Sequence, residues 1–280
     1  MEVQPLPGAS FGAEVTGVDL SRPLDAATKA ALSQALAENY ILCFHGQDLG
    51  PNNVVDASRV FGPVEPHVTP GYYHPDTDLL LVLSNQMDET GKPLGIKDAG
   101  TFWHSDVSYR ERPAKATMLY AIEAPDEGGD TLFCDMVAAL DALSPELRQK
   151  LEGRQAVHHY AQRDKIAAAQ GTTKVVSGQT EDKTPPVHHP ALRTHPVTGR
   201  TSLYVNPAYT TEVEGLDPAD SKATLARIYD HCLEDRFRLR YKWRAGDVVV
   251  WENMSVMHSA TTHDLPPDRG RTLWRTVISG

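Results

Sequence analysis

The pattern of apolar and polar positions along the chain predicts short strands more often than helices. A first helix is expected after Pro23, where Asp25 can cap a run that carries apolar residues at helical spacing. The apolar stretch Tyr40 to Phe44 predicts a buried strand that stops at Gly46, and a second short helix is expected over Val54 to Val60. Strands and helices alternate only loosely in this first part of the chain.

The later part of the chain holds most of the strand candidates. Helices are expected to begin at Ser144-Pro145 and Asp217-Pro218, because each pair is a cap residue followed by proline. Several short strands, few helices and no regular βαβ rhythm predict a mostly β fold with flanking helices, a double-stranded β-helix or jelly roll. The strand candidates are DLLLVLS, TLFCDM, TSLYVN, FRLRYKW, DVVVWEN and RTLWRTVIS.

Size, charge and cysteine usage narrow the class of protein. A chain of 280 residues with 40% hydrophobic residues suits one large domain over 1–280, and a net charge of −10 argues against a nucleic-acid partner. Three widely spaced cysteines without a CxxC motif suggest neither a disulfide framework nor a thiolate zinc site. The N-terminus lacks the features of a signal peptide, and no apolar run approaches the roughly 18 residues of a spanning helix. We therefore expect a cytoplasmic protein that is not inserted in a membrane.

The segment near 162–190 is polar and rich in glycine, threonine and proline, with no sustained periodicity. This composition predicts a mobile loop. A loop of this length inside a compact domain is usually either disordered or a functional lid. Candidate site residues flank the segment in sequence, which favours a lid, and disorder stays open as the alternative.

Two separated motifs together suggest a metal site. In TFWHSDVSY, His104 and Asp106 stand two apart on a predicted strand end, so their side chains project to the same side. Such a pair alone is more often a plain hydrogen bond. A strongly apolar strand much later in the chain delivers His258. Two histidines and one carboxylate can occupy one face of an octahedral ion and leave three positions for a bidentate 2-oxo acid and O2, which suits Fe(II) better than structural zinc.

Two arginines follow on the C-terminal strand. Arg271 and Arg275 are four apart in a run of alternating character, so they are expected on one face, inside the barrel. The alternative is a pair of exposed arginines on an edge strand. A buried guanidinium needs an anion, and the distal carboxylate of 2-oxoglutarate is a natural bidentate partner.

The motifs, taken in order, resemble the TauD/TfdA family of 2-oxoglutarate-dependent dioxygenases, which includes taurine and phenoxyacetate dioxygenases. The resemblance implies that the cofactor and co-substrates are Fe(II), 2-oxoglutarate and O2. It runs nearly end to end, through GAEVTGVDLSRPL, YILCFHGQDL, VFGPVEPH, HSD, EGGDTLFCDM, LYVNPAY, WENxxxxH and RTLWR.

The resemblance also implies roles for individual residues. Thr131 falls where the family hydrogen-bonds 2-oxoglutarate, and Arg271 falls where it binds the distal carboxylate of that acid. Arg275 falls where family members bind an anionic group of the primary substrate. His67 matches a second anion-contacting histidine, although a structural histidine is an equal alternative.

The spacing from His258 to Arg271 is about two residues longer than the taurine enzyme leads us to expect, and THDLPPDRG is the candidate insertion, expected to be a loop. Arg269 therefore stays open as an alternative to Arg271. The alternation that pairs Arg271 with Arg275 favours Arg271.

These residues predict a dioxygenase that hydroxylates a small anionic substrate (a carboxylate, sulfonate, sulfate or phosphonate) and releases succinate and CO2. Asp106 favours hydroxylation over halogenation, because related halogenases replace this carboxylate with a small residue. Bond cleavage or desaturation would use the same residues. The alternatives are a metal-dependent hydrolase with the same three ligands and a non-catalytic jelly-roll protein that binds a small acid. Dimers and tetramers are common among the relatives, so a homo-oligomer is compatible with the resemblance.

The remaining aromatic and histidine residues carry no assigned role. The aromatic residues either line the substrate cavity or pack in the core, and the histidines are expected on the surface or in loops. These residues are Trp103, Tyr109, Tyr204 and Tyr209, and His158, His159, His188 and His189.

Overall fold

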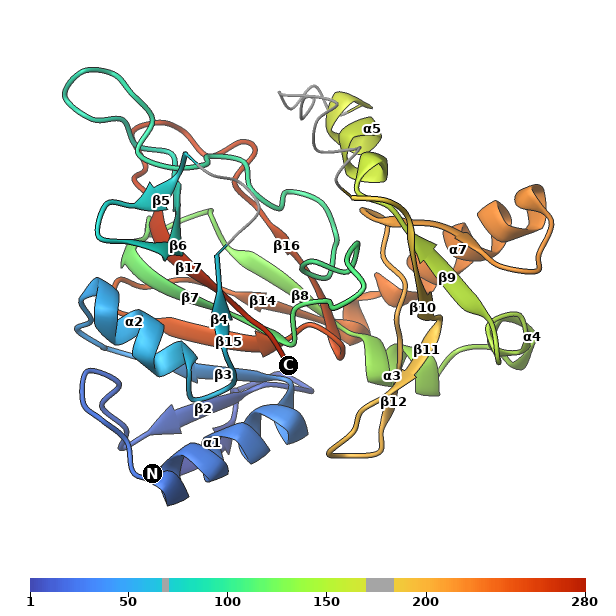
Figure 1. Ribbon diagram of the computed structural model, residues 1–280, viewed down its shortest axis with the longest axis horizontal. Coiled ribbons are helices and arrows are strands. Elements are labelled where there is room, and N and C mark those ends of the chain that lie inside the picture. Colours follow the sequence, from blue (N-terminus) through green and yellow to red (C-terminus); the bar gives the residue numbers. More distant parts are fainter. Residues whose placement is uncertain (67–70, 170–183) are drawn as a thin grey trace.

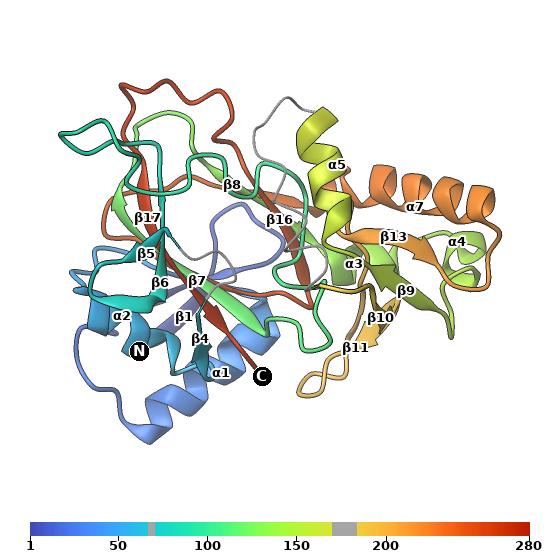
Figure 2. The ribbon, with the colours of Figure 1, turned by 45° about the horizontal axis from the view of Figure 1, so that its top comes forward.

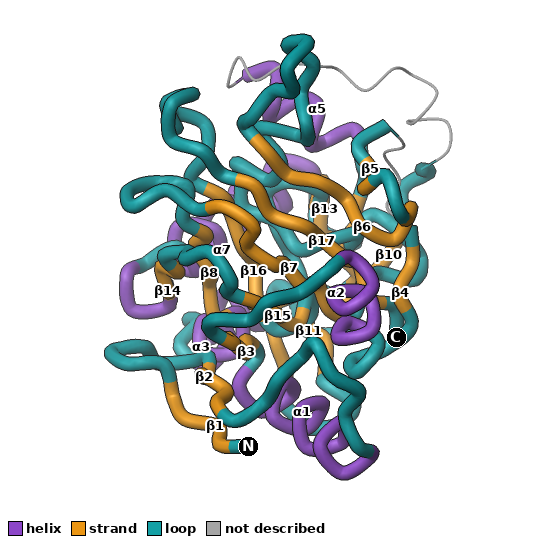
Figure 3. Tube along the Cα trace, turned by 90° about the vertical axis from the view of Figure 1, so that its left-hand side faces the viewer, coloured by secondary structure: helices purple, strands orange, loops and turns teal. Residues whose placement is uncertain are grey.

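The computed structural model describes residues 1–66, 71–169 and 184–280. Within these residues, the largest sheet has nine strands and forms the body of the molecule (Figures 1 and 3). Neighbouring strands are antiparallel, except for the parallel pair β2 and β3. The order is β1 (Glu2–Pro5), β2 (Ala13–Thr16), β3 (Ile41–Phe44), β15 (Val248–Glu252), β7 (Ala116–Glu123), β17 (Thr272–Ile278), β6 (Thr77–Ser84) and β5 (Tyr73–His74), with β4 (Val64–Glu65) paired to β17.

Smaller sheets and helices complete the described part of the fold. The smaller sheets are β14 (Arg238–Tyr241), β8 (Thr131–Asp135) and β16 (Val256–Ala260); β10 (Val187–Pro190), β9 (Gln155–His158) and β13 (Thr210–Val213); and β11 (Leu192–Thr194) with β12 (Thr201–Leu203). The helices are α1 (Ala26–Asn39), α2 (Pro51–Ser58), α3 (Met136–Asp141), α4 (Pro145–Gln149), α5 (Ala161–Ala169), α7 (Pro218–Cys232) and the 3₁₀ helix η1 (Asp235–Phe237).

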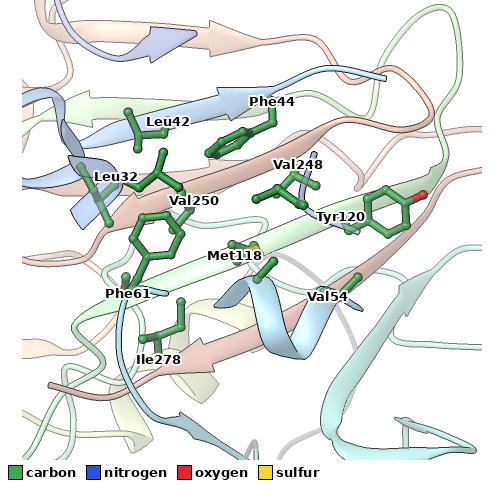
Figure 4. Packing of buried hydrophobic residues seen from close by; sticks show 14 of the residues in the cluster. Leu32, Leu42, Phe44, Val54, Phe61, Met118, Tyr120, Val248, Val250 and Ile278 are labelled. Carbon is green, nitrogen blue, oxygen red and sulfur yellow. The ribbon is translucent and has the colours of Figure 1, made fainter. Parts of the chain in front are cut away.

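The central strands of the large sheet are buried on both faces. On the outer face, Val248 and Val250 of β15 pack under α1 and α2 in the cluster drawn in Figure 4. On the inner face, Val249 and Trp251 pack against Phe133 of β8. Burial on both faces explains why these strands read as continuous apolar runs rather than as alternating ones. The sheet β14-β8-β16 thus packs on the inner face of the large sheet, as a jelly roll requires.

A further apolar cluster attaches the later elements to this double sheet. Cys134 of β8 and Met257 of β16 point away from the large sheet and pack with residues of α3, α7, β9 and β12. Figure 2 shows α4, α7, β9 and β13 gathered on one side of the molecule, next to β8 and β16. The metal-site candidates lie between the two sheets and beside this second cluster.

The expected helix starts are confirmed. Asp25, Ser144 and Asp217 each accept a hydrogen bond from a backbone N–H in the first turn of α1, α4 and α7. The second helix begins earlier than expected because Pro51 occupies its first turn, where a missing N–H has no cost. No helix of the described residues is long and apolar enough to cross a membrane.

The ends of the segment near 162–190 are more regular than the sequence indicated. Residues 161–169 form α5 and residues 187–190 form β10, which pairs with β9. Residues 170–183 lie outside the described residues, so a lid at this place stays a prediction.

Candidate active site

Backbone pairing brings the two candidate metal-binding histidines together. His104 and His258 exchange two hydrogen bonds: the His104 N–H donates to the His258 carbonyl at 3.0 Å, and the His258 N–H donates to the His104 carbonyl at 2.8 Å. His258 belongs to β16, whereas His104 forms only this isolated bridge and Asp106 lies in the turn after it. The expected strand end is therefore a single bridge, which still directs all three side chains to one point.

The three side chains form a compact donor set. Their ligand atoms all lie within 4.8 Å of one another, and all three residues are buried. Asp106 Oδ1 is 3.4 Å from His104 Nε2, and Asp106 Oδ2 is 3.6 Å from His258 Nε2. Neighbouring donors around a first-row ion with bonds of about 2.1 Å are separated by about 3 Å. The spacing therefore fits a single metal ion.

The protonation states also suit a cation. Burial opposes ionisation of Asp106, but Arg275 and the two imidazoles outweigh it, so the pKa of this carboxyl lies well below its ordinary value. Burial, followed by the nearby His104, holds the pKa of His258 well below its ordinary value. An ionised carboxylate and a neutral imidazole are the forms that bind metals. His104 also has the usual outer contact of a ligand, since its Nδ1 lies 2.8 Å from the Phe102 carbonyl oxygen.

Asp106 is held from three directions. Thr117 on β7 donates to Asp106 Oδ2 at 2.7 Å, and Arg275 Nη2 donates to Asp106 Oδ1 at 2.6 Å. The Asp106 backbone N–H donates to Asn253 Oδ1 at 3.2 Å, and Asn253 Nδ2 donates to the Thr117 hydroxyl at 3.0 Å. The Asn253 oxygen also accepts from Trp251 Nε1. Because Thr117 and Asn253 are fully buried, this network fixes the carboxylate firmly.

Arg271 is a buried cation beside the donor set. Its Nε donates to the Gly129 carbonyl at 2.8 Å, and burial lowers its pKa to about 10. Among the described residues no carboxylate forms an ion pair with it. Thr131 is also buried, and its hydroxyl oxygen accepts from Trp243 Nε1 at 3.0 Å, which leaves the hydroxyl proton able to be donated to a ligand. Arg271, Thr131, Arg275 and the three metal donors line one cavity.

Two glycines allow the site to pack closely. Gly129 has φ +67°, and a Cβ there would lie 2.8 Å from Arg271 Cδ. Gly100 has φ +73°, and a Cβ there would lie 2.8 Å from His104 Cε1. Both positions therefore require glycine for its backbone conformation and for space.

The structure separates the two arginine alternatives. Arg269 lies in the loop between β16 and β17, where it contacts the backbone and carboxylate of exposed Glu127. Arg271, in contrast, is buried in the cavity wall, with its backbone N–H bonded to Asn85. The prediction that Arg271 and Arg275 face the interior together agrees with the cavity lining. His67 lies outside the described residues, and its role stays a prediction.

The expectation for the histidines is wrong at two positions. His158 and His189 are buried on the paired strands β9 and β10, not in loops. His158 Nδ1 lies 3.1 Å from the Ser108 hydroxyl, and the His158 ring stacks on Tyr204. These contacts join the turn that carries Asp106 to β9 and to the residue that follows β12. Tyr209, one of the aromatic residues without an assigned role, has its ring centroid 6.4 Å from that of His104.

The sequence interpretation missed Thr117, Asn253, Gly100 and Gly129. Thr117 sits in the run ATMLYAIE, which is typical of a core strand and gives no sign of a polar role. The sequence does contain a signal for Gly129, because the adjacent glycines Gly128 and Gly129 before a strand indicate a backbone conformation that L side chains rarely adopt.

Comparison with known proteins identifies the same chemistry. A family model described as "Taurine catabolism dioxygenase TauD, TfdA family" matches residues 2–277. The chain is 32% identical over 268 residues to the alpha-ketoglutarate-dependent 2,4-dichlorophenoxyacetate dioxygenase of Cupriavidus pinatubonensis, with 92% of each chain covered. It is 33% identical over 282 residues to the (S)-phenoxypropionate/alpha-ketoglutarate-dioxygenase of Sphingobium herbicidovorans, covering 100% of this chain and 95% of the relative. The solved structure of AAD-2 in complex with Mn(II) and N-oxalylglycine is similar at a TM-score of 0.83 and 27% identity, covering 100% and 98% of the two chains.

The fold, the buried His-Asp-His set and these similarities define a dioxygenase that depends on 2-oxoglutarate (alpha-ketoglutarate). The chain belongs to the TauD/TfdA family. It uses Fe(II), 2-oxoglutarate and O2 and acts on a small molecule.

Proposed function

We propose that His104, Asp106 and His258 hold the Fe(II), that Arg271 and Thr131 bind 2-oxoglutarate, and that the enzyme hydroxylates a small anionic substrate. The observation that carries this proposal is the placement of Arg271, buried and with no ion-paired carboxylate among the described residues, in the same cavity as the three metal donors. When bound, Fe(II) and 2-oxoglutarate supply the oxidation, in which one atom of O2 enters the succinate formed with CO2 and the other enters a substrate C–H bond.

The chain's own residues account for how the co-substrate is oriented. A guanidinium that is buried without a carboxylate is costly, and the distal carboxylate of 2-oxoglutarate relieves this cost by pairing with Arg271 in a bidentate manner. Thr131 at the start of β8 can donate its hydroxyl proton to the same carboxylate. Both residues are fixed by protein contacts before the co-substrate arrives, which lowers the entropic cost of binding.

We assign the substrate anion to Arg275. This arginine reaches the cavity next to Asp106, so an anion paired with it would lie close to the metal. The named substrates of the two relatives above, 2,4-dichlorophenoxyacetate and phenoxypropionate, each carry a carboxylate. His67 is proposed as a second contact to the same anion.

The proposal is tested by measuring succinate release with anionic substrates and with a neutral analogue. Phenoxyacetate and taurine are compared with neutral phenoxyacetamide, using the wild type, Arg271→Gln, Arg275→Gln and the control Arg269→Gln. Loss of a charge-assisted contact costs roughly 1.5–3 kcal/mol, which corresponds to about 10- to 150-fold in affinity.

We expect Arg271→Gln to weaken the apparent affinity for the co-substrate by about that factor and Arg275→Gln to weaken the apparent affinity for the anionic substrate, whereas Arg269→Gln changes neither. Equal turnover of the anionic and neutral compounds would overturn the assignment of Arg275. Turnover without 2-oxoglutarate and O2 would overturn the proposal as a whole.

A further inference from the structure

A second cavity, of about 770 Å³, lies apart from the metal site. Its walls come from α1, from the segment 111–115 before β7, from β11 and the turn after it, and from the end of β15. None of the metal donors and neither of the active-site arginines lines it. Its volume is in the range of small-molecule sites, which is about 300–1,000 Å³.

The floor of this cavity is apolar. It is formed by buried residues of separate elements, so it is a built part of the fold. These residues are Leu36, Ala37, Phe61, Ala114 and Tyr204, each less than 8% exposed.

The rim of the cavity carries three cations. Arg112, Lys115 and Arg193 line it, and among the described residues none of the three forms an ion pair with a carboxylate. Lys115 Nζ donates to the Phe61 carbonyl at 2.8 Å, and the Arg193 guanidinium lies over the Tyr204 ring at 4.5 Å. The exposed Glu111 also lines the cavity, so the three cations outnumber the one exposed carboxylate side chain there.

The buried carboxylate in the wall, Glu252, is bonded within the wall and forms no ion pair with these three cations. His195 Nδ1 accepts from the backbone N–H groups of Val197 and Thr198, both at 3.1 Å, so its proton is on Nε2. Nε2 donates to Glu252 Oε1 at 2.7 Å, and Ser255 donates to the other oxygen at 2.9 Å. Glu252 thus has its hydrogen-bonding partners inside the wall, and the cations of the rim remain available to a ligand.

We propose that this cavity binds a small amphipathic anion, with an apolar and preferably aromatic body on the floor and a carboxylate or sulfonate at the cationic rim. Arg193 is the central contact, because its guanidinium lies over the ring of Tyr204 and so joins the cationic rim to the apolar floor. The proposal does not depend on the function assigned to the metal site.

The test uses 8-anilinonaphthalene-1-sulfonate, whose fluorescence reports binding to an apolar surface. The active site is first filled with Mn(II) and N-oxalylglycine. We expect one probe molecule per chain, and about a tenfold higher Kd in Arg193→Gln and in Arg112→Gln, since each variant loses one charged contact. The control variants Arg148→Gln and Arg227→Gln remove exposed arginines that pair with Glu152 and Glu146, and their Kd should match that of the wild type.

Three results would overturn the proposal. The first is an unchanged Kd in the exposed-rim variant Arg112→Gln and in Arg193→Gln, with both variants folded by circular dichroism. The second is equal affinity for the neutral analogue N-phenyl-1-naphthylamine, which would make the site merely apolar. The third is a dimer, detected by sedimentation velocity, that does not bind the probe, together with a monomeric Val197→Asp variant that does. This result would mean that the cavity is an interface between copies of the chain.

Discussion

Asp106 makes the largest number of contacts in the donor set. Its two carboxylate oxygens and its backbone N–H are bonded to Arg275, Thr117 and Asn253, which come from three different strands or strand ends. Each carboxylate oxygen has two lone pairs, so these bonds leave room for a metal. The orientation of this proposed metal ligand is therefore set by residues outside the donor set.

Replacing Thr117 tests this positioning. In Thr117→Val the hydroxyl that donates to Asp106 is lost and Asn253 Nδ2 loses its acceptor, whereas Thr117→Ser keeps both bonds. Outer contacts of this kind are worth about 10- to 100-fold in metal affinity. We expect Thr117→Val to raise the Kd of Mn(II) by about tenfold and Thr117→Ser to leave it near the wild-type value. Equal Mn(II) affinity in all three proteins, measured by electron paramagnetic resonance, would show that Thr117 does not position Asp106.

Gly129 tests the packing of Arg271. Gly129→Ala introduces a Cβ 2.8 Å from Arg271 Cδ at a position with φ +67°. The matched control is Gly153→Ala, which has φ +70° but open space around the new Cβ, so it carries only the backbone strain. By titration calorimetry of the Mn(II)-loaded protein, we expect co-substrate binding to weaken about tenfold in Gly129→Ala and to stay unchanged in Gly153→Ala. Similar affinity for the co-substrate in both variants would mean that Arg271 does not bind it.

At the scale of elements, the sequence predicted strands and helix starts well where one local pattern determines them. Asp25, Ser144 and Asp217 cap their helices as expected, because capping depends on residues within one turn. The jelly roll followed from the number of short strands. The buried network of Thr117 and Asn253 could not be predicted, since it depends on pairing between β7 and β15, which are far apart in the chain.

The histidines of β9 and β10 show a different limit. The run VHHP alternates buried and exposed residues, with Val187 and His189 inside, but histidine carries no clear preference for either side. His158 lies in a polar cluster with Ser108, Asn206 and Thr210, which belong to other segments of the chain. Its burial became apparent only from the paired strands.

His158 makes stability depend on pH. Burial, followed by the nearby His189, lowers the pKa of His158 from 6.5 to about 3. Below pH 6.5 the unfolded chain takes up this proton, whereas the folded protein does so only near pH 3, so acidification through this window destabilises the fold. The contribution between pH 7 and pH 5 is about 2 kcal/mol.

Urea unfolding at these two pH values checks this contribution. The loss of unfolding free energy from pH 7 to pH 5 should be smaller by about 2 kcal/mol in His158→Gln than in the wild type. The control His188→Gln changes an exposed neighbour on β10 and should show the wild-type loss. An unchanged pH dependence in His158→Gln would contradict the assignment of a buried, neutral His158.

At the scale of the whole molecule, the double sheet explains why residues distant in sequence meet. His258 on β16 and Arg275 on β17 come from strands of different sheets, and the cavity lies between those sheets. The sequence indicated that these residues belong together through their types and through the family resemblance. It could not give the ion pair between Arg275 and Asp106, which places the proposed substrate contact directly on a proposed metal ligand.

The most direct measurement is anaerobic titration of the Fe(II)-loaded protein with 2-oxoglutarate, followed by the weak visible absorption band of a 2-oxo acid chelated to Fe(II). We predict a band that saturates at one equivalent in the wild type, is absent in His104→Ala and His258→Ala, and needs at least about tenfold more co-substrate in Arg271→Gln but not in Arg269→Gln. A band that persists in the histidine variants, or no band in folded, iron-loaded wild type, would contradict the proposed site.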